Sequence, residues 1–211
     1  MPKGKFIALE GVDGSGISTQ VGLLKKWFLG RGERVFATKE PTDGPIGALI
    51  RQALTRRVVR PDGSPLDDTT LALLFAADRV DHLRCQIVPK LEHGVHVISD
   101  RYYLSSFAYQ SLGDDLEWIK IINSRARRPD LFILLVVPPI TSQERMSRDR
   151  WQVDLYEELP KMEVILRNYL AVARRLKEEG ENVRIIDGAR PLEEVQGEIR
   201  TLVEGVLKVL D

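Results

Sequence analysis

The stretch "FIALEGVDGSGISTQ" (residues 6–20) decides how the rest of the chain is interpreted. A short apolar run leads into a glycine-rich segment, and a segment of helical character follows it. Residues 11–18 fit the phosphate-binding loop pattern G-x-x-x-x-G-K-[ST] at every fixed position except one. Ile17 stands where the pattern requires a lysine. The chain therefore has either a phosphate-binding loop without its cation or an ordinary glycine-rich turn.

The local context favours the phosphate-binding loop. The pattern has to follow a strand and open a helix, and "KFIALE" and "STQVGLLKKWFL" meet both conditions. Glycines at positions 11, 14 and 16 let the backbone turn its N–H groups toward a phosphate. The positive end of the following helix points to the same place. Ser18 then supplies the hydroxyl expected on a Mg²⁺ ion.

Apolar runs and amphipathic segments alternate along the whole chain. The strand candidates are residues 5–11, 34–40, 95–100, 131–137 and 182–187. Their continuous apolar character is typical of parallel strands that are buried on both faces. The alternation predicts an α/β fold with three α/β/α layers and a central five-stranded parallel sheet. With no internal repeat or low-complexity linker, residues 1–211 are expected to form one domain.

Local signals predict where several helices begin and end. Asp68 is a candidate N-cap for a long helix through residues 71–91. Thr141 and Glu144 match a capping box in front of "SQERMSRDR". Gly180 is expected to end a long helix that starts near residue 156.

Composition limits the possible partners. Lys+Arg and Asp+Glu both number 31, so no overall charge attracts nucleic acid or a membrane. Cys85 is the one cysteine, which excludes an internal disulfide, is compatible with a cytoplasmic location, and is expected to be a small buried hydrophobe. The three histidines at 82, 93 and 96 have no metal-ligand spacing and are expected to be structural or on the surface. No segment approaches about 18 uncharged apolar residues, so no membrane span is expected.

An acid and a base follow the third strand candidate. "VHVISD" ends in Asp100, and kinases with this loop carry an acidic residue at the end of an apolar strand to hold the metal. The next residue is Arg101, a cation suited to an anionic second substrate.

Several ordered motifs together resemble the thymidylate kinase family, whose members pass the γ-phosphoryl group of ATP to dTMP. The loop is followed by "TKEPTDGPIGALIR", similar to the T-R-E-P segment, and by "LLFAADRVDH", similar to the F-A-A-D-R helix. "ISDRYYLSSFAYQ" resembles the D-R-Y…A-Y-Q segment, and "RPDLFILLVV" the R-P-D strand. The resemblance covers nearly the whole chain. It implies a P-loop kinase fold, ATP, Mg²⁺ and dTMP as ligands, and a homodimer.

The resemblance also implies roles for individual residues. Those expected to bind ATP are Gly11, Val12, Asp13, Gly14, Ser15, Gly16, Ile17, Ser18 and Thr19. Those expected to bind dTMP are Asp13, Glu40, Pro41, Leu54, Phe75, Arg79, Arg101, Ser106, Tyr109 and Gln110. Phe75 is expected both to stack on thymine and to belong to the core, with either role dominant, and Tyr109 is expected to lie against the ribose. Ser18 and Asp100 are expected at the metal.

Catalytic cations are expected outside the loop. A lid at residues 141–157 is implied, with Arg145, Arg148 and Arg150 as its candidate catalytic arginines. Asp13 and Arg101 complete the expected catalytic set. The two departures from the family pattern are Lys39, in place of the arginine of T-R-E-P, and Ile17.

Three interpretations of Ile17 remain open. Other cations can replace the missing lysine, the chain can be a nucleotide-binding relative with weak or no turnover, or position 17 can carry an altered residue. A kinase for another nucleoside monophosphate, such as dUMP, is the alternative enzyme. A GTPase is disfavoured because no N-K-x-D-like guanine motif follows a later strand.

Overall fold

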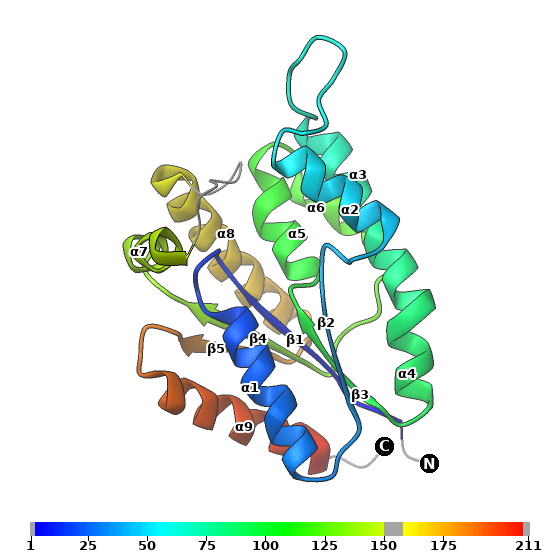
Figure 1. Ribbon diagram of the computed structural model, residues 1–211, viewed down its shortest axis with the longest axis vertical. Helices are drawn as coiled ribbons and strands as arrows, with labels where there is room; N and C mark the ends of the chain where they lie inside the picture. The colour runs from blue at the N-terminus through cyan, green and yellow to red at the C-terminus, as the bar shows by residue number, and fades with distance from the viewer. Residues whose placement is uncertain (1–2, 150–157, 209–211) are drawn as a thin grey trace.

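A computed structural model describes residues 3–149 and 158–208 of the chain, and for Arg148 and Asp149 it describes the backbone alone. In this part of the chain, five strands form one parallel sheet in the order β2-β3-β1-β4-β5 (Figure 1). They are β1 (Phe6–Gly11), β2 (Val35–Lys39), β3 (His96–Asp100), β4 (Leu131–Val136) and β5 (Val183–Asp187). All five lie within one residue of the strands predicted from the apolar runs.

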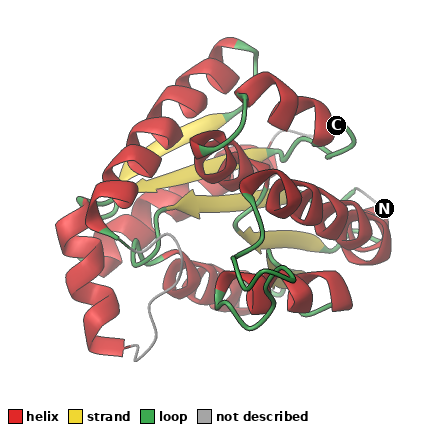
Figure 2. Cartoon of the chain, turned by 90° about the horizontal axis from the view of Figure 1, so that it is seen from above, coloured by secondary structure: helices red, strands yellow, loops and turns green. Residues whose placement is uncertain are grey.

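Helices cover both faces of the sheet, as the view in Figure 2 shows. Helices α1 (Ile17–Gly30) and α9 (Leu192–Lys208) pack on one face, where they share an apolar cluster with β1, β3, β4 and β5. The other face is covered by α5 (Tyr103–Tyr109), α8 (Leu159–Glu178) and the helical segment that runs from α3 into α4. The predicted three-layer α/β/α P-loop kinase fold is confirmed.

The other helices connect and flank these layers. α2 (Pro45–Leu54) packs against α3 (Asp68–His82), which continues through the π-helical turn η1 (Leu83–Ile87) into α4 (Val88–Glu92). The 3-10 turn η2 (Gln110–Leu112) and α6 (Leu116–Ile122) follow α5, and α7 (Pro139–Asp149) follows β4. No helix of the described part of the chain is long and apolar enough to cross a membrane.

The strand register positions the site. Cα partners across the sheet run from Lys39 to Asp100 and from Asp100 to Leu9, so the ends of β2, β3 and β1 form one row. Because the strands are parallel, their carboxyl ends meet at the same edge, where ligands bind in open α/β sheets.

The structure corrects several local predictions. Asp67, not Asp68, caps α3, and its side chain accepts from the N–H of Thr70. α7 begins at Pro139, so Thr141 lies inside its first turn and is not a cap. β2 is partly exposed because it is an edge strand. The prediction for Gly180 is confirmed: it follows the end of α8 with φ +86°.

Cys85 is a further correction, because its side chain is exposed and donates to Asp81 rather than being buried. It lies in the π-helical turn η1, where the extra residue changes the phase of the helix faces. An apolar face extrapolated from the preceding α-helix therefore does not apply at position 85.

Candidate active site

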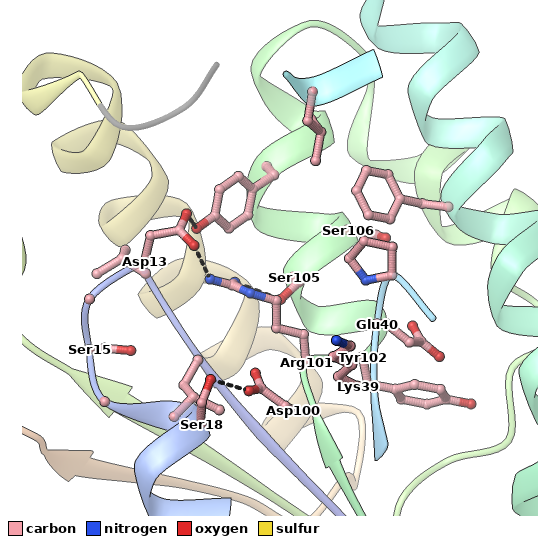
Figure 3. A pocket seen from close by; sticks show the side chains of 18 of the residues that line it. Asp13, Ser15, Ser18, Lys39, Glu40, Asp100, Arg101, Tyr102, Ser105 and Ser106 are labelled. Atoms are coloured by element: carbon pink, nitrogen blue, oxygen red, sulfur yellow. Dashed lines mark hydrogen bonds and ion pairs between the residues drawn. The ribbon is translucent and has the colours of Figure 1, made fainter. Parts of the chain in front are cut away.

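A cavity of about 530 Å³ opens at the carboxyl edge of the sheet (Figure 3). It collects residues from the loop after β1, the ends of β2 and β3, and helices α2, α3, α5 and α7. Every residue predicted to bind dTMP or the metal lines it, as do residues 12–19 of the loop. Gly11 lies outside this lining, and its carbonyl oxygen accepts from Nη1 of Arg101 at 2.8 Å.

The loop has the left-handed backbone that the glycine pattern predicts, with φ of +76° at Gly14 and +92° at Gly16. Gly14 is also required by packing, since a Cβ there would lie 2.4 Å from the carbonyl oxygen of Ser142 in α7. Helix α1 begins at Ile17, directly after Gly16. The first turn of this helix therefore faces the cavity with its positive end.

Ile17 contributes no charge to this arrangement. Its side chain is only 5% exposed and belongs to the apolar cluster between α1 and the sheet. The branched side chain is therefore accommodated as a core residue, although it also forms part of the cavity wall.

Ser18 and Asp100 meet where α1 approaches the end of β3. The Ser18 hydroxyl donates to Oδ2 of Asp100 at 2.5 Å (Figure 3). One hydroxyl and one carboxylate are hard oxygen donors suited to Mg²⁺, which keeps waters and substrate phosphates as its other ligands. Among the described residues no cluster of three or more His, Cys, Asp or Glu could hold a metal ion alone.

Arg101 connects the loop to the segment after β3. Its Nη2 donates to Oδ1 of Asp13 at 2.8 Å (Figure 3). The hydroxyl of Tyr109 donates to Oδ2 of the same carboxylate at 2.9 Å. Arg101 has a left-handed backbone with φ +69°, which is uncommon for a residue other than glycine. Such strain persists only where the surroundings hold the residue in place, as the hydrogen bonds of both terminal guanidinium nitrogens do here.

Glu10, which sequence analysis did not single out, lies fully buried beneath this network. Its carboxylate accepts from the backbone N–H of Tyr102 at 2.9 Å and from the hydroxyl of Ser105 at 2.5 Å. The hydroxyl of Tyr169 also contacts it, at 3.4 Å. Burial raises the pKa of Glu10 to about 8, although the Ser105 hydrogen bond and the positive charge of Arg101 partly oppose that rise.

A second buried network supports the part of the cavity lined by Glu40, Pro41 and Phe75, here called the acceptor side because these residues are predicted to bind dTMP. Nη2 of Arg79 pairs with Oε2 of Glu40 at 2.8 Å, and Oε1 of Glu40 contacts Nδ1 of His82 at 3.0 Å. Both charged side chains are at most 3% exposed. Arg79 also donates to Asn123. His82 is thus structural, as predicted, and Arg79 is held by protein partners although it lines the cavity.

The turn after β2 is anchored to α3. The Glu40–Pro41 peptide bond is cis. Thr42 donates to the carboxylate of Asp78 through its N–H at 2.8 Å and through its hydroxyl at 2.6 Å. Arg51 of α2 donates to the carbonyl oxygens of Pro41 and Thr42. The turn that carries Glu40 and Pro41 is therefore fixed from two helices.

The outer part of the acceptor side has an aromatic face and unpaired polar atoms. Phe75 is only partly buried and lines the cavity, so it is not a core residue. Oγ of Ser106 and Oε1 of Gln110 are buried and have no hydrogen-bond partner among the described residues. Unsatisfied polar atoms beside a partly exposed ring are suited to the flat, hydrogen-bonding edge of a base.

The predicted lid arginines are described only in part. Arg145 lines the cavity from α7, and both of its terminal nitrogens lie 3.3 Å from the carbonyl oxygen of Gly188. The side chain of Arg148, the whole of Arg150 and the 150–157 part of the predicted lid lie outside the described residues.

Several lining residues were given no role from the sequence. Lys39 and Arg51 belong to the segment that resembles T-R-E-P, and Ser105 to the segment after Arg101. Lys39, Arg51 and Ser105 could have been predicted as lining residues because they lie inside the motifs that resemble the family. Glu10 carried a signal too, since it is a charged residue in an otherwise apolar strand candidate.

Comparison with known proteins identifies relatives over almost the full chain. A family model described as thymidylate kinase matches residues 9–199. A probable thymidylate kinase of Pyrococcus abyssi is 43% identical over 204 residues, which cover 96% of this chain and 97% of that protein. A probable thymidylate kinase of Pyrobaculum aerophilum is 41% identical, with 96% and 98% covered. A thymidylate kinase of Leifsonia xyli subsp. xyli is 38% identical, with 96% and 95% covered.

Proposed function

Because the chain belongs to the thymidylate kinase family, we propose that this cavity phosphorylates dTMP to dTDP with ATP and Mg²⁺, in dTTP synthesis. The chain is a transferase, a nucleoside monophosphate kinase. One observation supports the assignment of the site. The loop, Asp100 and Arg101 line the same cavity as Phe75, Ser106 and Gln110. The phosphate-binding half and the base-binding half are thereby joined at Arg101.

The donor half is the loop and the start of α1. Backbone N–H groups of residues 12–19 and the positive end of the helix bind the phosphates of ATP. Asp100 and the hydroxyl of Ser18 would hold Mg²⁺: both are hard oxygen donors, and their 2.5 Å hydrogen bond brings them to one place. When bound, this ion neutralises charge on the β- and γ-phosphates.

The acceptor half holds the monophosphate between aromatic and polar groups. Phe75 stacks on the thymine ring, and Ser106 and Gln110 supply hydrogen bonds to its edge. Tyr109 forms the wall beside the ribose, with its hydroxyl already held by Asp13 at 2.9 Å. Glu40, Pro41 and Leu54 complete the lining of this half. Arg79 acts here mainly by fixing Glu40.

The transfer itself needs positioning and charge more than proton abstraction. An oxygen of the dTMP phosphate attacks the γ-phosphorus of ATP, and the bond from that phosphorus to the bridging oxygen of ADP breaks. Since the monophosphate is largely ionised near pH 7, the attacking oxygen has no proton to lose. Arg101 grips the acceptor phosphate bidentately once that phosphate competes with Asp13 for its guanidinium.

The lid, the domain and the assembly are part of the same proposal. One domain carries a lid at 141–157, from which Arg145, Arg148 or Arg150 approaches the phosphates. A homodimer forms through the apolar surface at residues 70–90 and 104–122. Leu73 of α3 is 49% exposed and Ile121 of α6 is 67% exposed, which supports this surface as the dimer interface.

The cytoplasm is the proposed location, because the single cysteine excludes an internal disulfide.

The test is the formation of dTDP from dTMP by this chain and its Ile17→Lys variant side by side, with and without EDTA. We expect turnover by the parent within about tenfold of the variant, and its loss on removal of Mg²⁺. Turnover by the variant alone would mean that Ile17 inactivates the parent. Faster phosphorylation of dUMP than of dTMP would mean that dUMP is the acceptor substrate. A failure of both proteins to bind dTMP would refute the assignment to thymidylate phosphorylation.

A further inference from the structure

Phosphoryl transfer in this cavity lacks one cation that the loop normally supplies. Ile17 is buried in the core and brings no charge to the phosphates. A γ-phosphoryl group in transfer spreads its negative charge over three oxygens, which are stabilised by surrounding cations. A cation from another element has to approach it.

Most of the described cationic side chains that line the cavity are already bound by other groups of the protein. Arg79 is 2% exposed and paired with Glu40. Arg51 donates to two backbone carbonyl oxygens of the turn after β2. Arg101 is bound by Asp13 and by the carbonyl oxygen of Gly11, and faces the acceptor. Among the residues that the structure describes, two lining cations remain, Arg145 and Lys39.

Arg145 lies on the other side of the loop. Its guanidinium contacts the carbonyl oxygen of Gly188, which follows β5. The sheet order β2-β3-β1-β4-β5 places β4 and β5 on one side of β1, and the strands that carry Glu40 and Arg101 on the other. In this structure Arg145 therefore approaches the loop from the side away from the acceptor.

Lys39 lies on the acceptor side, beside the metal residues. Its Cα pairs with that of Asp100, so both side chains project from the same face of the sheet. Asp100 contacts Ser18 on that face, which places the start of α1 there too (Figure 3). Neighbouring strands are about 4.8 Å apart, a span that the flexible four-carbon side chain of lysine covers.

The ammonium group of Lys39 can also change partners readily. It pairs with Asp43 at 3.1 Å, and the two side chains are 54% and 80% exposed. Exposed ion pairs of this kind are weak. The oxygens of a bound triphosphate can therefore displace Asp43.

The geometry points to Lys39 as the catalytic cation that replaces the missing loop lysine. Its Nζ donates to oxygens of the γ-phosphoryl group from the acceptor side of the cavity. This inference rests on the proposed phosphoryl-transfer site.

Nucleotide binding tests this contact without turnover. The affinities of Mg·ATP and Mg·ADP are measured by calorimetry, in the absence of dTMP, for the parent and for Lys39→Met. We expect Lys39→Met to weaken Mg·ATP about ten- to hundredfold and Mg·ADP by less than about threefold, since only ATP has the γ-phosphoryl group. Lys26→Met, at an exposed lysine of α1 outside the cavity, is the control and should leave both affinities unchanged. Equal Mg·ATP affinities in the parent and in Lys39→Met overturn the proposal, and equal losses for ATP and ADP overturn the γ-phosphoryl contact.

Measurements of turnover test whether a lysine at position 17 restores the activity that Lys39→Met loses. Lys39→Met should lower kcat about 10²-fold, the effect of removing one preorganised donor, with the KM for dTMP within about threefold. Ile17→Lys in the Lys39→Met background should restore kcat to within about tenfold of the parent. A double variant as slow as Lys39→Met overturns the replacement of one cation by the other. Lys39→Arg keeps the charge and should retain more activity than Lys39→Met.

The two proposals fail separately. If Mg·ATP binding depends on Lys39 but neither the parent nor Ile17→Lys forms dTDP, the acceptor is wrong and the contact of Lys39 with the γ-phosphoryl group stands. If Ile17→Lys forms dTDP and the parent does not, the acceptor is right and Lys39 does not replace the loop lysine. If the parent forms dTDP and Lys39→Met does so equally well, the function stands and the inference about Lys39 fails.

Discussion

The guanidinium of Arg101 lies 2.8 Å from the carboxylate of Asp13, so an ion pair joins the phosphate-binding loop to the segment after β3. The hydroxyl of Tyr109 occupies the other oxygen of that carboxylate. Asp13 thus fixes the two groups that we place at the monophosphate and at its ribose. A single residue of the donor loop thereby arranges the acceptor half.

Replacing Asp13 by asparagine tests this arrangement. The amide has one acceptor oxygen for two donors, so Arg101 or Tyr109 loses its partner. We expect kcat to fall about 10²-fold, because a misplaced reacting group costs about that much. Steady-state kinetics with dTMP measure it. Tyr109→Phe removes one of the two bonds and should cost less, whereas equal kcat values in the parent and in Asp13→Asn would contradict the role given to the ion pair.

Phe75 should contribute to dTMP affinity but little to stability. Stacking of a base on an aromatic side chain is worth about 1–3 kcal/mol, so Phe75→Ala should weaken dTMP binding about five- to 150-fold. Phe75→Tyr keeps the ring and should bind nearly as well. Phe28→Ala is the matched comparison for stability: Phe28 is fully buried, and its removal should cost about 3–5 kcal/mol. Unchanged dTMP affinity in Phe75→Ala would remove the residue from the base site.

The buried pair of Glu40 and Arg79 should be important for stability. Glu40→Gln leaves the guanidinium of Arg79 buried without its counter-charge, which typically costs about 3–5 kcal/mol. Urea unfolding measures the loss. The control is Glu204→Gln, because Glu204 pairs with Arg31 at 3.2 Å with both side chains more than 40% exposed. That exposed pair should contribute less than about 1 kcal/mol, so similar losses in the two variants would contradict the prediction.

Glu10 should make the stability of the protein depend on pH. Burial raises its pKa to about 8 in the folded state from an ordinary value of 4.5. The folded state therefore holds a proton that the unfolded state has released between these pH values. Stability falls as pH rises through this window, by at most about 1.4 kcal/mol per pH unit from this one group, and levels off above the folded pKa.

Glu10→Gln isolates that contribution. The amide does not titrate, so the free energy of unfolding of the parent relative to the variant should decrease from pH 5 to pH 8. Denaturant unfolding at several pH values in this range measures the difference in free energy of unfolding between the two proteins. Because both proteins share the other titrating groups, the contributions of those groups largely cancel in this difference. Parallel curves for the two proteins would mean that Glu10 has no raised pKa.

Local patterns were sufficient for the layers, because each apolar run is short and bounded. They also placed the loop and Asp100 at the carboxyl ends of parallel strands. Most of the other lining residues were implied by the resemblance to the thymidylate kinase family. The buried network of Glu10 could not be paired from the sequence, since its partners Ser105 and Tyr169 lie 95 and 159 residues away. The ion pair between Arg79 and Glu40 could not be predicted from the sequence either. A motif specifies the type of a residue but not which partner its side chain binds.

The buried position of Ile17 has a consequence for how such proteins are counted. The backbone of the loop keeps its left-handed glycines and its place between β1 and α1 without the lysine of the signature. A search for phosphate-binding loops that requires this lysine would omit the present chain, although its loop has the same backbone path. The chain path, rather than the signature letter, defines membership of the class.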